Sequence, residues 1–239
     1  MKKIFTILTV VALATTTSFA QFSVKAGLNM ANIVSNDDNV DSGMKLGMII
    51  GGSYALEISD AMNLDISATY KQSGTKETEE SSQTSSGVTN KYESSVTYAV
   101  NYLDISPSLS FNVSDAMSLS FGPYLAFALG GKVKGETTIT SSGGTSNGSA
   151  TTSSEQSLKF GTGINDDLKG TDFGLNIGAN FSINDAMIVS AGYALGLTNL
   201  LHWDDNAKNY FNAANEDIPS FKNSGIFLTF GYSFGGGYY

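Results

Sequence analysis

Large apolar residues alternate with small polar residues along eight segments of this chain. In the first segment the apolar positions are Phe22, Val24, Ala26, Leu28 and Met30, and the residues between them are Ser23, Lys25, Gly27, Asn29 and Ala31. The other segments are 44–58, 62–70, 102–113, 117–130, 172–183, 187–197 and 226–234. Because successive side chains of a strand point to opposite faces, this pattern predicts eight strands, each with one apolar face.

A short motif recurs three times between these segments, as Leu56–Met62, Phe111–Met117 and Phe181–Met187. Its general form is an apolar residue, any residue, Ile or Val, Ser or Asn, then Asp-Ala-Met, and the turn residues are Asp60, Asp115 and Asp185. The apolar residues on either side of each turn are separated by three residues, so both lie on the same face of the paired strands. The motif therefore predicts three tight hairpins.

The other four connections are longer, at 35–42, 71–96, 135–157 and 198–221. Segment 71–96 is rich in Ser, Thr and Glu, and segment 135–157 is a low-complexity stretch of Ser, Thr and Gly. Such compositions bury little apolar surface, so we expect long mobile loops there, with frayed strand ends beside the first. Pro107 lies on the apolar face of its strand, where it cannot donate a ladder hydrogen bond, and we expect a bulge or kink at that position.

The composition of the polar faces indicates which side of the sheet is inside. A soluble barrel would present Lys and Glu to water, whereas these faces carry mostly Gly, Ser, Asn and Ala, which fit inside a narrow barrel. Large apolar side chains on the other face, short turns at one end and long loops at the other are typical of outer-membrane barrels. The sequence predicts an all-β fold, an eight-stranded antiparallel up-and-down transmembrane β-barrel with short periplasmic turns and long external loops. A secreted lipocalin-like ligand-binding barrel is the alternative.

The first twenty residues have the features of a secretory signal peptide. Met1-Lys2-Lys3 precedes the apolar run Ile4–Ala14, and Ser18-Phe19-Ala20 offers small residues for cleavage after Ala20. We expect a signal peptide at 1–20 and one barrel domain at 21–239. Without Lys2 and Lys3 the chain has 11 lysines against 22 acidic residues, and it has no arginine, which argues against a nucleic-acid partner. There is no cysteine, so neither a disulfide nor a lipoprotein anchor is expected.

Three short motifs resemble those of the PorT-like outer-membrane β-barrel family of Bacteroidota. They are Val24-Lys25-Ala26-Gly27-Leu28-Asn29, Tyr102-Leu103-Asp104-Ile105-Ser106-Pro107 and Gly192-Tyr193-x-Leu195-Gly196-Leu197-Thr198-Asn199-Leu200. The segment Asn223-x-Gly225-x-x-Leu228-x-Phe230 is also similar to the C-terminal signal recognised for barrel assembly, although Gly235–Tyr239 follows it. The resemblance implies the same barrel fold, and the family's namesake is linked to secretion and gliding machinery.

Charged residues on the predicted inner face are candidates for a polar lumen. They are Lys25, Lys45, Glu57, Asp65, Asp104 and Asp172. Unpaired buried charge is costly, so we expect these side chains to pair inside the barrel. A polar pathway for a small solute or ion is the alternative, although the side chains of eight strands nearly fill the interior.

One loop carries the remaining chemical candidates, His202, Trp203 and Asp204. His202 with Asp204 or Asp205 could serve as a general base on lipid, but no serine nucleophile has a spacing that ties it to them. We interpret them as an exposed histidine beside an interfacial Trp. The acidic pairs Asp37-Asp38, Asp166-Asp167 and Asp204-Asp205 lack the spacing of a calcium loop, so they are read as solvated charge, with loose divalent bridging to lipid as the alternative.

Taken together, these features predict a non-enzymatic outer-membrane protein with a structural, surface-contact or partner-binding role. We expect no catalytic, cofactor or metal residues and no cofactor. The expected partners are outer-membrane lipid and lipopolysaccharide, the barrel assembly machinery during insertion, and an envelope or external protein that contacts the long loops, since loops of this length exceed what a hairpin needs.

Overall fold

Nine antiparallel strands and one helix make up the described part of the chain, which is residues 20–36, 43–143, 147–163, 166–203, 205–214 and 216–234 of a computed structural model. The strands are β1 (Ala20–Ser35), β2 (Lys45–Ser59), β3 (Met62–Ser85), β4 (Val88–Ser114), β5 (Met117–Ser142), β6 (Gly148–Ser157), β7 (Thr171–Ser182), β8 (Met187–Gly196) and β9 (Phe221–Phe234), and the helix is α2 (Asp205–Ala214). The proposed signal peptide lies outside the described residues except for Ala20, and so does Gly235–Tyr239.

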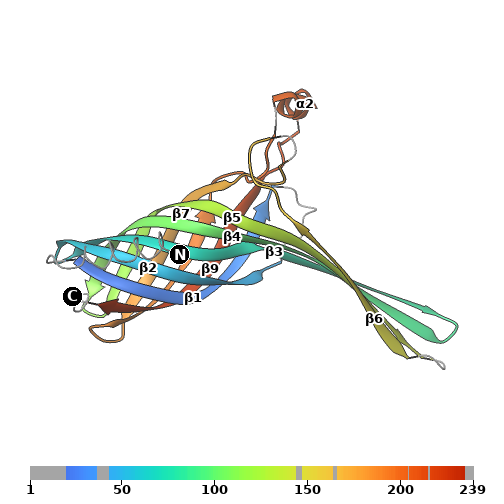
Figure 1. The fold of residues 1–239 in the computed structure, drawn as a ribbon, viewed down its shortest axis with the longest axis horizontal. Helices are drawn as coiled ribbons and strands as arrows, with labels where there is room; N and C mark the ends of the chain where they lie inside the picture. The colour runs from blue at the N-terminus through green and yellow to red at the C-terminus, as the bar shows by residue number, and fades with distance from the viewer. Residues whose placement is uncertain are drawn as a thin grey trace, which may run out of the picture.

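Eight of these strands close into a ring (Figure 1). The order is β4-β3-β2-β1-β9-β8-β7-β5, and β5 pairs back with β4 to complete the circle. The first and last strands meet in register, with Phe22 opposite Phe234. The predicted eight-stranded antiparallel barrel is therefore confirmed. No helix among the described residues is long and apolar enough to cross a bilayer.

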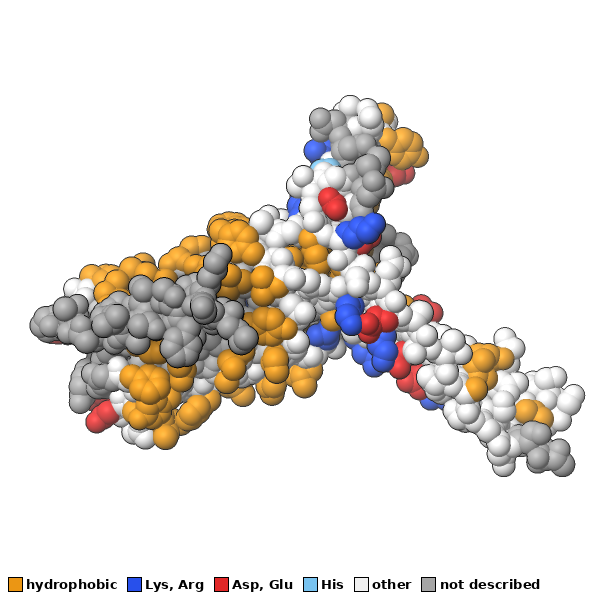
Figure 2. All heavy atoms as spheres, viewed as in Figure 1, with side chains coloured by type: hydrophobic (Ala, Val, Ile, Leu, Met, Phe, Trp, Pro, Cys, Tyr) orange, Lys and Arg blue, Asp and Glu red, His pale blue; other side chains and the backbone are white. Residues whose placement is uncertain are grey.

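The two faces of the ring have the predicted chemistry. Apolar side chains such as Leu28 and Phe121 are about half exposed on the outside, at 50% and 51%, whereas Ser23 and Asn29 are buried inside. Figure 2 shows hydrophobic side chains spread over the visible side of the barrel. An apolar band outside and a polar interior are what a lipid environment requires of a β-barrel.

The two segments expected to be mobile loops are instead strands. β3 and β4 run far past the barrel and remain paired to Ser85 and Val88, where the turn Ser86-Gly87 joins them. β5 extends beside β4 to Ser142, and β6 pairs with β5. Residues 76–85, 88–97, 132–142 and 148–157 thus form a four-stranded sheet, the arm, which projects from the end of the barrel opposite the tight turns (Figure 1). The prediction failed because hydroxyl-rich strands have little apolar alternation to identify them.

The side chains of β5 exchange faces of the sheet where the barrel becomes the arm. Asn101 of β4 pairs with Gly130, but Tyr102 pairs with Ala128, so one extra residue of β5 lies between them. Such a bulge reverses the side-chain alternation beyond it. Odd-numbered residues of β5 such as Phe127 face lipid in the barrel, whereas Val133 and Ile139 in the arm lie on the side that continues the lumen.

The bulge expected at Pro107 is not there. Pro107 pairs with Ile66 in an unbroken register with β3, and the register shifts of β4 against β5 fall at Asn101/Tyr102 and Asn112/Ser114. On the β5 side the ladder is interrupted between Ile105 and Leu109 without a change of register. Pro107 fits in this gap because proline has no backbone N–H and so cannot donate a ladder hydrogen bond to β5.

The three repeated motifs form the tight turns at one end of the barrel. The alanine carbonyl of each turn accepts a hydrogen bond from a neighbouring hairpin's backbone, so that Ala61 accepts from Asn112, Ala116 from Ser182 and Ala186 from Ser233, at 2.9, 2.9 and 2.7 Å. Asp60, Asp115 and Asp185 are exposed beside these carbonyls. The repeat therefore ties each turn to the next strand as well as reversing the chain.

Gly74 allows the chain to leave the barrel and enter the arm. Its φ is +129°, and a Cβ there would collide with the carbonyl oxygen of Tyr98 on β4. We expect Gly74→Ala to lower the free energy of unfolding by at least about 1–3 kcal/mol, since the strained backbone alone costs that much. Urea unfolding in lipid vesicles measures the change. Gly148→Ala is the matched control, because a Cβ at Gly148 would meet nothing within 4 Å and should cost little.

Candidate functional site: the closed lumen and the arm

The barrel encloses a polar cavity of about 150 Å³. Its wall carries serine, threonine and asparagine side chains together with Lys25, Asp65, Lys71 and Asp104. Residues beside the tight turns, including Ser114, Asp115 and Ser182, also line it, so the cavity reaches the turn end of the barrel. This volume holds a few water molecules or one small polar solute.

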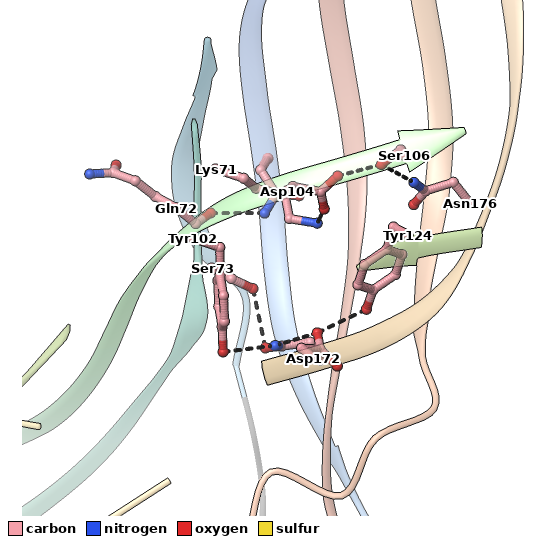
Figure 3. Close-up of polar contacts among 11 residues, drawn as sticks. Lys71, Gln72, Ser73, Tyr102, Asp104, Ser106, Tyr124, Asp172 and Asn176 are labelled. Atoms are coloured by element: carbon pink, nitrogen blue, oxygen red, sulfur yellow. Dashed lines mark hydrogen bonds and ion pairs between the residues drawn. The ribbon is translucent and has the colours of Figure 1, made fainter. Parts of the chain in front are cut away.

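An ion pair joins two neighbouring strands inside the lumen. The Lys71 ammonium lies 2.5 Å from Asp104 Oδ2, and both side chains are largely buried, with exposed fractions of 13% and 5% (Figure 3). Ser106 donates to the other oxygen of Asp104, and Asn176 on β7 donates to Ser106 at 3.3 Å. Lys71 also lies over the Tyr124 ring, 4.4 Å from its centroid. The ion pair and its contacts thus join β3, β4, β5 and β7, which are four consecutive strands of the ring.

A second set of polar contacts lies closer to the turns. Lys25 Nζ donates to Ser67 at 2.6 Å and lies in the electrostatic field of Asp65 and Asp104. Ser110 donates to Asp65 at 2.6 Å. Opposite charges thus share the cavity, which lowers the cost of burying each of them.

Above the ion pair, Asp172 collects the polar side chains nearest the arm end of the barrel. One of its oxygens, Oδ2, accepts from Tyr124 and from Asn223, both at 2.9 Å, and Asn223 also donates to Tyr102 at 3.2 Å (Figure 3). Asp172 is 2% exposed, and its Oδ1 has no hydrogen-bond partner among the described residues. Asp172 also lines a small space of about 10 Å³ together with Lys71 and Ser73, enough for about one water molecule.

An apolar plug closes the barrel above this layer. Leu158, Phe160 and Leu168 from the β6–β7 connection, with Leu200 and Leu201 from the β8–α2 connection, pack on the wall residues Val100, Tyr102, Tyr124, Ala126 and Ala194. Leu200 is 1% exposed, and the two connections are joined by the bond from Lys169 N to Leu200 O, 2.8 Å. The lumen therefore ends in packed side chains at this end.

Asn199 holds the plug in place. Its Oδ1 accepts from the backbone of Leu201 and Phe221 at 3.1 and 3.0 Å, and its Nδ2 donates to Pro219 O at 3.0 Å. The Thr198 hydroxyl beside it accepts from Phe173 N at 2.9 Å. In the motif Thr198-Asn199-Leu200, the first two side chains thus bond to the backbone of neighbouring segments, and the third is buried in the plug.

The six predicted lumen charges divide into three groups. Lys25, Asp65 and Asp104 share the main cavity, and Asp172 lies in the layer above it. Lys45 and Glu57 line neither space, and Glu57 is exposed near a tight turn. The counter-ion that binds Asp104 is Lys71, which the sequence placed in a loop.

The two loop candidates that the structure describes, His202 and Trp203, are not hydrogen-bonded to each other. No hydrogen bond joins His202 to a serine or an acid in the part of the chain that the structure describes, and Asp204 lies outside that part, as do Asp37 and Asp38. Trp203 donates to Pro219 O at 2.9 Å and contacts Phe211 of α2 edge to face. The helix itself lies in a connection expected to be irregular.

The remaining acidic pair is used for local structure. Asp166 accepts from Gly163 N at 2.7 Å and Asp167 from Lys159 N at 2.8 Å, so both carboxylates close turns of the β6–β7 connection. Among the described ranges, no three histidine, aspartate or glutamate side chains gather in a way that could hold a metal ion.

The arm has two chemically different faces. The face that continues the lipid side of the barrel carries most of the charge, including the ion pairs Lys91–Glu80, Lys132–Glu155 and Lys134–Glu136 at 2.9, 2.5 and 3.1 Å. The bond from Lys91 to Glu80 raises the pKa of that lysine above its ordinary value. The face that continues the lumen carries an apolar stripe, Tyr92, Val96, Tyr98, Val133 and Ile139. Figure 2 shows charged side chains gathered where the arm leaves the barrel.

Several residues of the lumen were missed by sequence reasoning. Tyr102 and Tyr124 stood on the predicted polar faces, yet nothing in the alternation showed that they close the barrel. Asn223 could have been found by extending the last strand inward along its polar face, because it shares that face with Thr229 and Ser233. Lys71 was not predicted because it begins the polar segment 71–96, whose composition resembles that of a loop.

Comparison with known proteins gives one family and several similar structures. A family model described as "Outer membrane protein beta-barrel domain" matches residues 14–202. No curated protein matches the chain. Among solved structures, Ail, the attachment invasion locus protein of Yersinia pestis in complex with sucrose octasulfate, shares 13% identity over 91% of this chain and 100% of that one, with a TM-score of 0.40. Neisserial surface protein A shares 14% over 91% and 100%, at 0.40, and the P. putida toluene transporter TodX shares 9% over 95% and 92%, at 0.22.

Proposed function

Because this chain belongs to the outer membrane protein β-barrel domain family and is located in the outer membrane, we propose that it is a non-enzymatic surface protein whose arm contacts a partner outside the cell. The observation that carries the proposal is the arm itself. A barrel needs only short connections to close its hairpins, yet here four strands continue as an ordered sheet well beyond the lipid band. Ordered structure of that size away from the membrane is typical of a binding surface.

The closed lumen supports a surface role. The plug and the Tyr102–Asp172–Asn223 layer fill the end of the barrel from which the arm projects. The expected contacts with outer-leaflet lipid and lipopolysaccharide fit the hydrophobic band and the charges at the root of the arm. A secretion-associated role, as the PorT-like resemblance implies, would place the arm's partner among exported proteins.

An arm-truncated variant tests this proposal. Thr78, Ser95, Glu136 and Ser153 lie in one row across the sheet, so residues 79–94 and 137–152 can each be replaced by Asn-Gly without changing that row. Both forms are extracted from their own membranes in mild detergent, and their mass and composition are compared. We expect the full chain to carry a stoichiometric partner that the truncated barrel lacks. A truncated chain that folds and keeps the same partner would contradict the proposal.

Passage of a small solute through the lumen is the second candidate, and the polar cavity of about 150 Å³ at the turn end favours it. Because the plug seals the other end, we expect the protein to give no single-channel conductance in planar bilayers. A variant lacking 158–168 serves as the comparison that should conduct. Steady openings of the unmodified chain would favour the passage function.

A further inference from the structure

We propose that the free edge of β6 is a binding site for an extended segment of a partner polypeptide, which adds to the arm as a further strand. The inference rests on the proposed surface function and deepens it by naming the surface and the chemistry of its partner. In the described chain β6 pairs with β5 and with no other strand, and all ten of its residues are exposed. Alternate residues of such an edge strand direct their backbone N–H and C=O groups outward, ready to bond.

The two edges of the arm differ in a way that selects β6. On the β3 edge, Lys76, Glu77, Glu79 and Glu80 place charge along the strand, and the Gly43 carbonyl accepts from the Lys76 backbone at 3.3 Å. Charged side chains of this kind discourage strand addition. β6, with the sequence GSATTSSEQS, has neither lysine nor proline. Its single charge, Glu155, is already bound to Lys132 on β5 at 2.5 Å.

The side chains around this edge define the kind of strand that fits. On the lumen-side face, β6 contributes Gly148, Ala150, Thr152, Ser154 and Gln156, which pair with the β5 positions of the apolar stripe and its intervening residues. Most of these side chains are small, so the strip of surface along β6 is lower than the side chains of Ile139 and Val133 on β5. An added strand with large apolar residues at alternate positions would cover this strip and extend the stripe.

A partner peptide fits the edge better than a second copy of this chain. If two β6 edges met, each would offer the other only small side chains on the lumen-side face, and no new apolar contact would form. The carboxylates nearest the stripe on that face, Glu77 and Glu79, lie on the far strand β3. The strip beside β6 is therefore uncharged, and the segment that fits it carries uncharged residues on its lumen-side face, with large apolar ones among them.

The test uses the absence of cysteine from the chain. Single-cysteine variants Thr152→Cys on β6 and Ser81→Cys on β3 place one thiol on the same face at each edge of the full-length protein. The probe is a synthetic peptide with the β5 sequence Lys132–Ser142, which pairs with β6 in the native sheet, carrying an activated disulfide in place of Thr137. A second probe is methylated on alternate backbone nitrogens, which removes its ladder hydrogen bonds and keeps its side chains.

We expect the unmethylated peptide to react with Thr152→Cys at least tenfold faster than with Ser81→Cys, and methylation to remove that advantage. Equal rates at the two edges, or no effect of methylation, would overturn the proposal. Rapid linkage of Thr152→Cys chains to one another, with the peptide excluded, would assign the edge to a second copy and overturn it too. If the peptide fails while arm truncation still releases a partner, only this inference is lost. If the peptide binds but truncation releases nothing, the proposed function fails instead.

Discussion

Lys71→Met lowers the free energy of unfolding of the barrel by about 3–5 kcal/mol, the cost of breaking a buried ion pair by removing one partner. The substitution leaves the Asp104 carboxylate, whose side chain is 5% exposed, without the lysine that binds it and with Ser106 as its remaining bonded side chain. The contact between the Lys71 ammonium and the Tyr124 ring is lost as well. Urea unfolding in lipid vesicles, followed by circular dichroism and by the gel mobility of unheated samples, measures the loss.

Two further variants show whether the loss of stability comes from leaving a charge buried without its partner. Lys132→Met breaks an ion pair of similar length on the arm, where Lys132 and Glu155 are 59% and 51% exposed, and we expect a change below about 1 kcal/mol. Lys71→Met combined with Asp104→Leu removes both buried charges and should recover most of the loss. Equal effects of Lys71→Met and Lys132→Met would show that the lumen pair is as hydrated as the surface pair.

Leu200→Ala is the second large effect, and it acts on the plug. The side chain is 1% exposed within an apolar cluster, and truncating a buried leucine in this way costs about 2–5 kcal/mol. The damage should remain local because Leu200 belongs to a connection and not to the ring. We expect amide exchange at Lys169 and Leu200, whose N–H groups bond to Leu200 O and Phe221 O, to accelerate at least tenfold while the strands stay protected.

Leu197→Ala is the matched control for the plug. Leu197 lies three residues earlier and is 44% exposed on the outside of the barrel, where lipid chains can fill the space left by the missing atoms. Its replacement should leave exchange at Lys169 and Leu200 nearly unchanged. An unchanged exchange rate after Leu200→Ala would mean that this side chain does not hold the connections in the barrel mouth.

The barrel could be predicted from the sequence because lipid and lumen impose opposite chemistry on alternate residues. Leu28 and Asn29, or Phe121 and Gly122, show this directly, and the repeated Asp-Ala-Met turns fix the hairpins. The arm could not, because both of its faces lie outside the membrane and its Ser and Thr residues give no strong alternation. The strands of the arm are continuations of barrel strands, since β3 and β4 extend their ladder outward in one register and β5 extends beside β4 after the one-residue bulge at Leu129.

The lumen was predicted in part for a related reason. Alternation places a charge such as Asp104 or Asp172 inside, but the partner of each charge depends on how the strands pair and in which register. Lys71 and Asp104 meet across β3 and β4, and Asp172 meets Asn223 from a strand two places away in the ring. The plug forms because the β6–β7 and β8–α2 connections pack against each other, and no pattern within either segment predicts that contact.

Thiol labelling on intact cells determines whether this outer-membrane barrel displays the arm outside the cell. Ser153→Cys places the only thiol of the chain on β6 of the arm, and Asp115→Cys places it on a tight turn at the other end of the barrel, where both positions are exposed. A membrane-impermeant maleimide is added before and after the cells are broken. We expect Ser153→Cys to react on intact cells and Asp115→Cys to react only after breakage. Labelling of Asp115→Cys on intact cells, with Ser153→Cys protected, would place the arm in the periplasm and contradict this expectation.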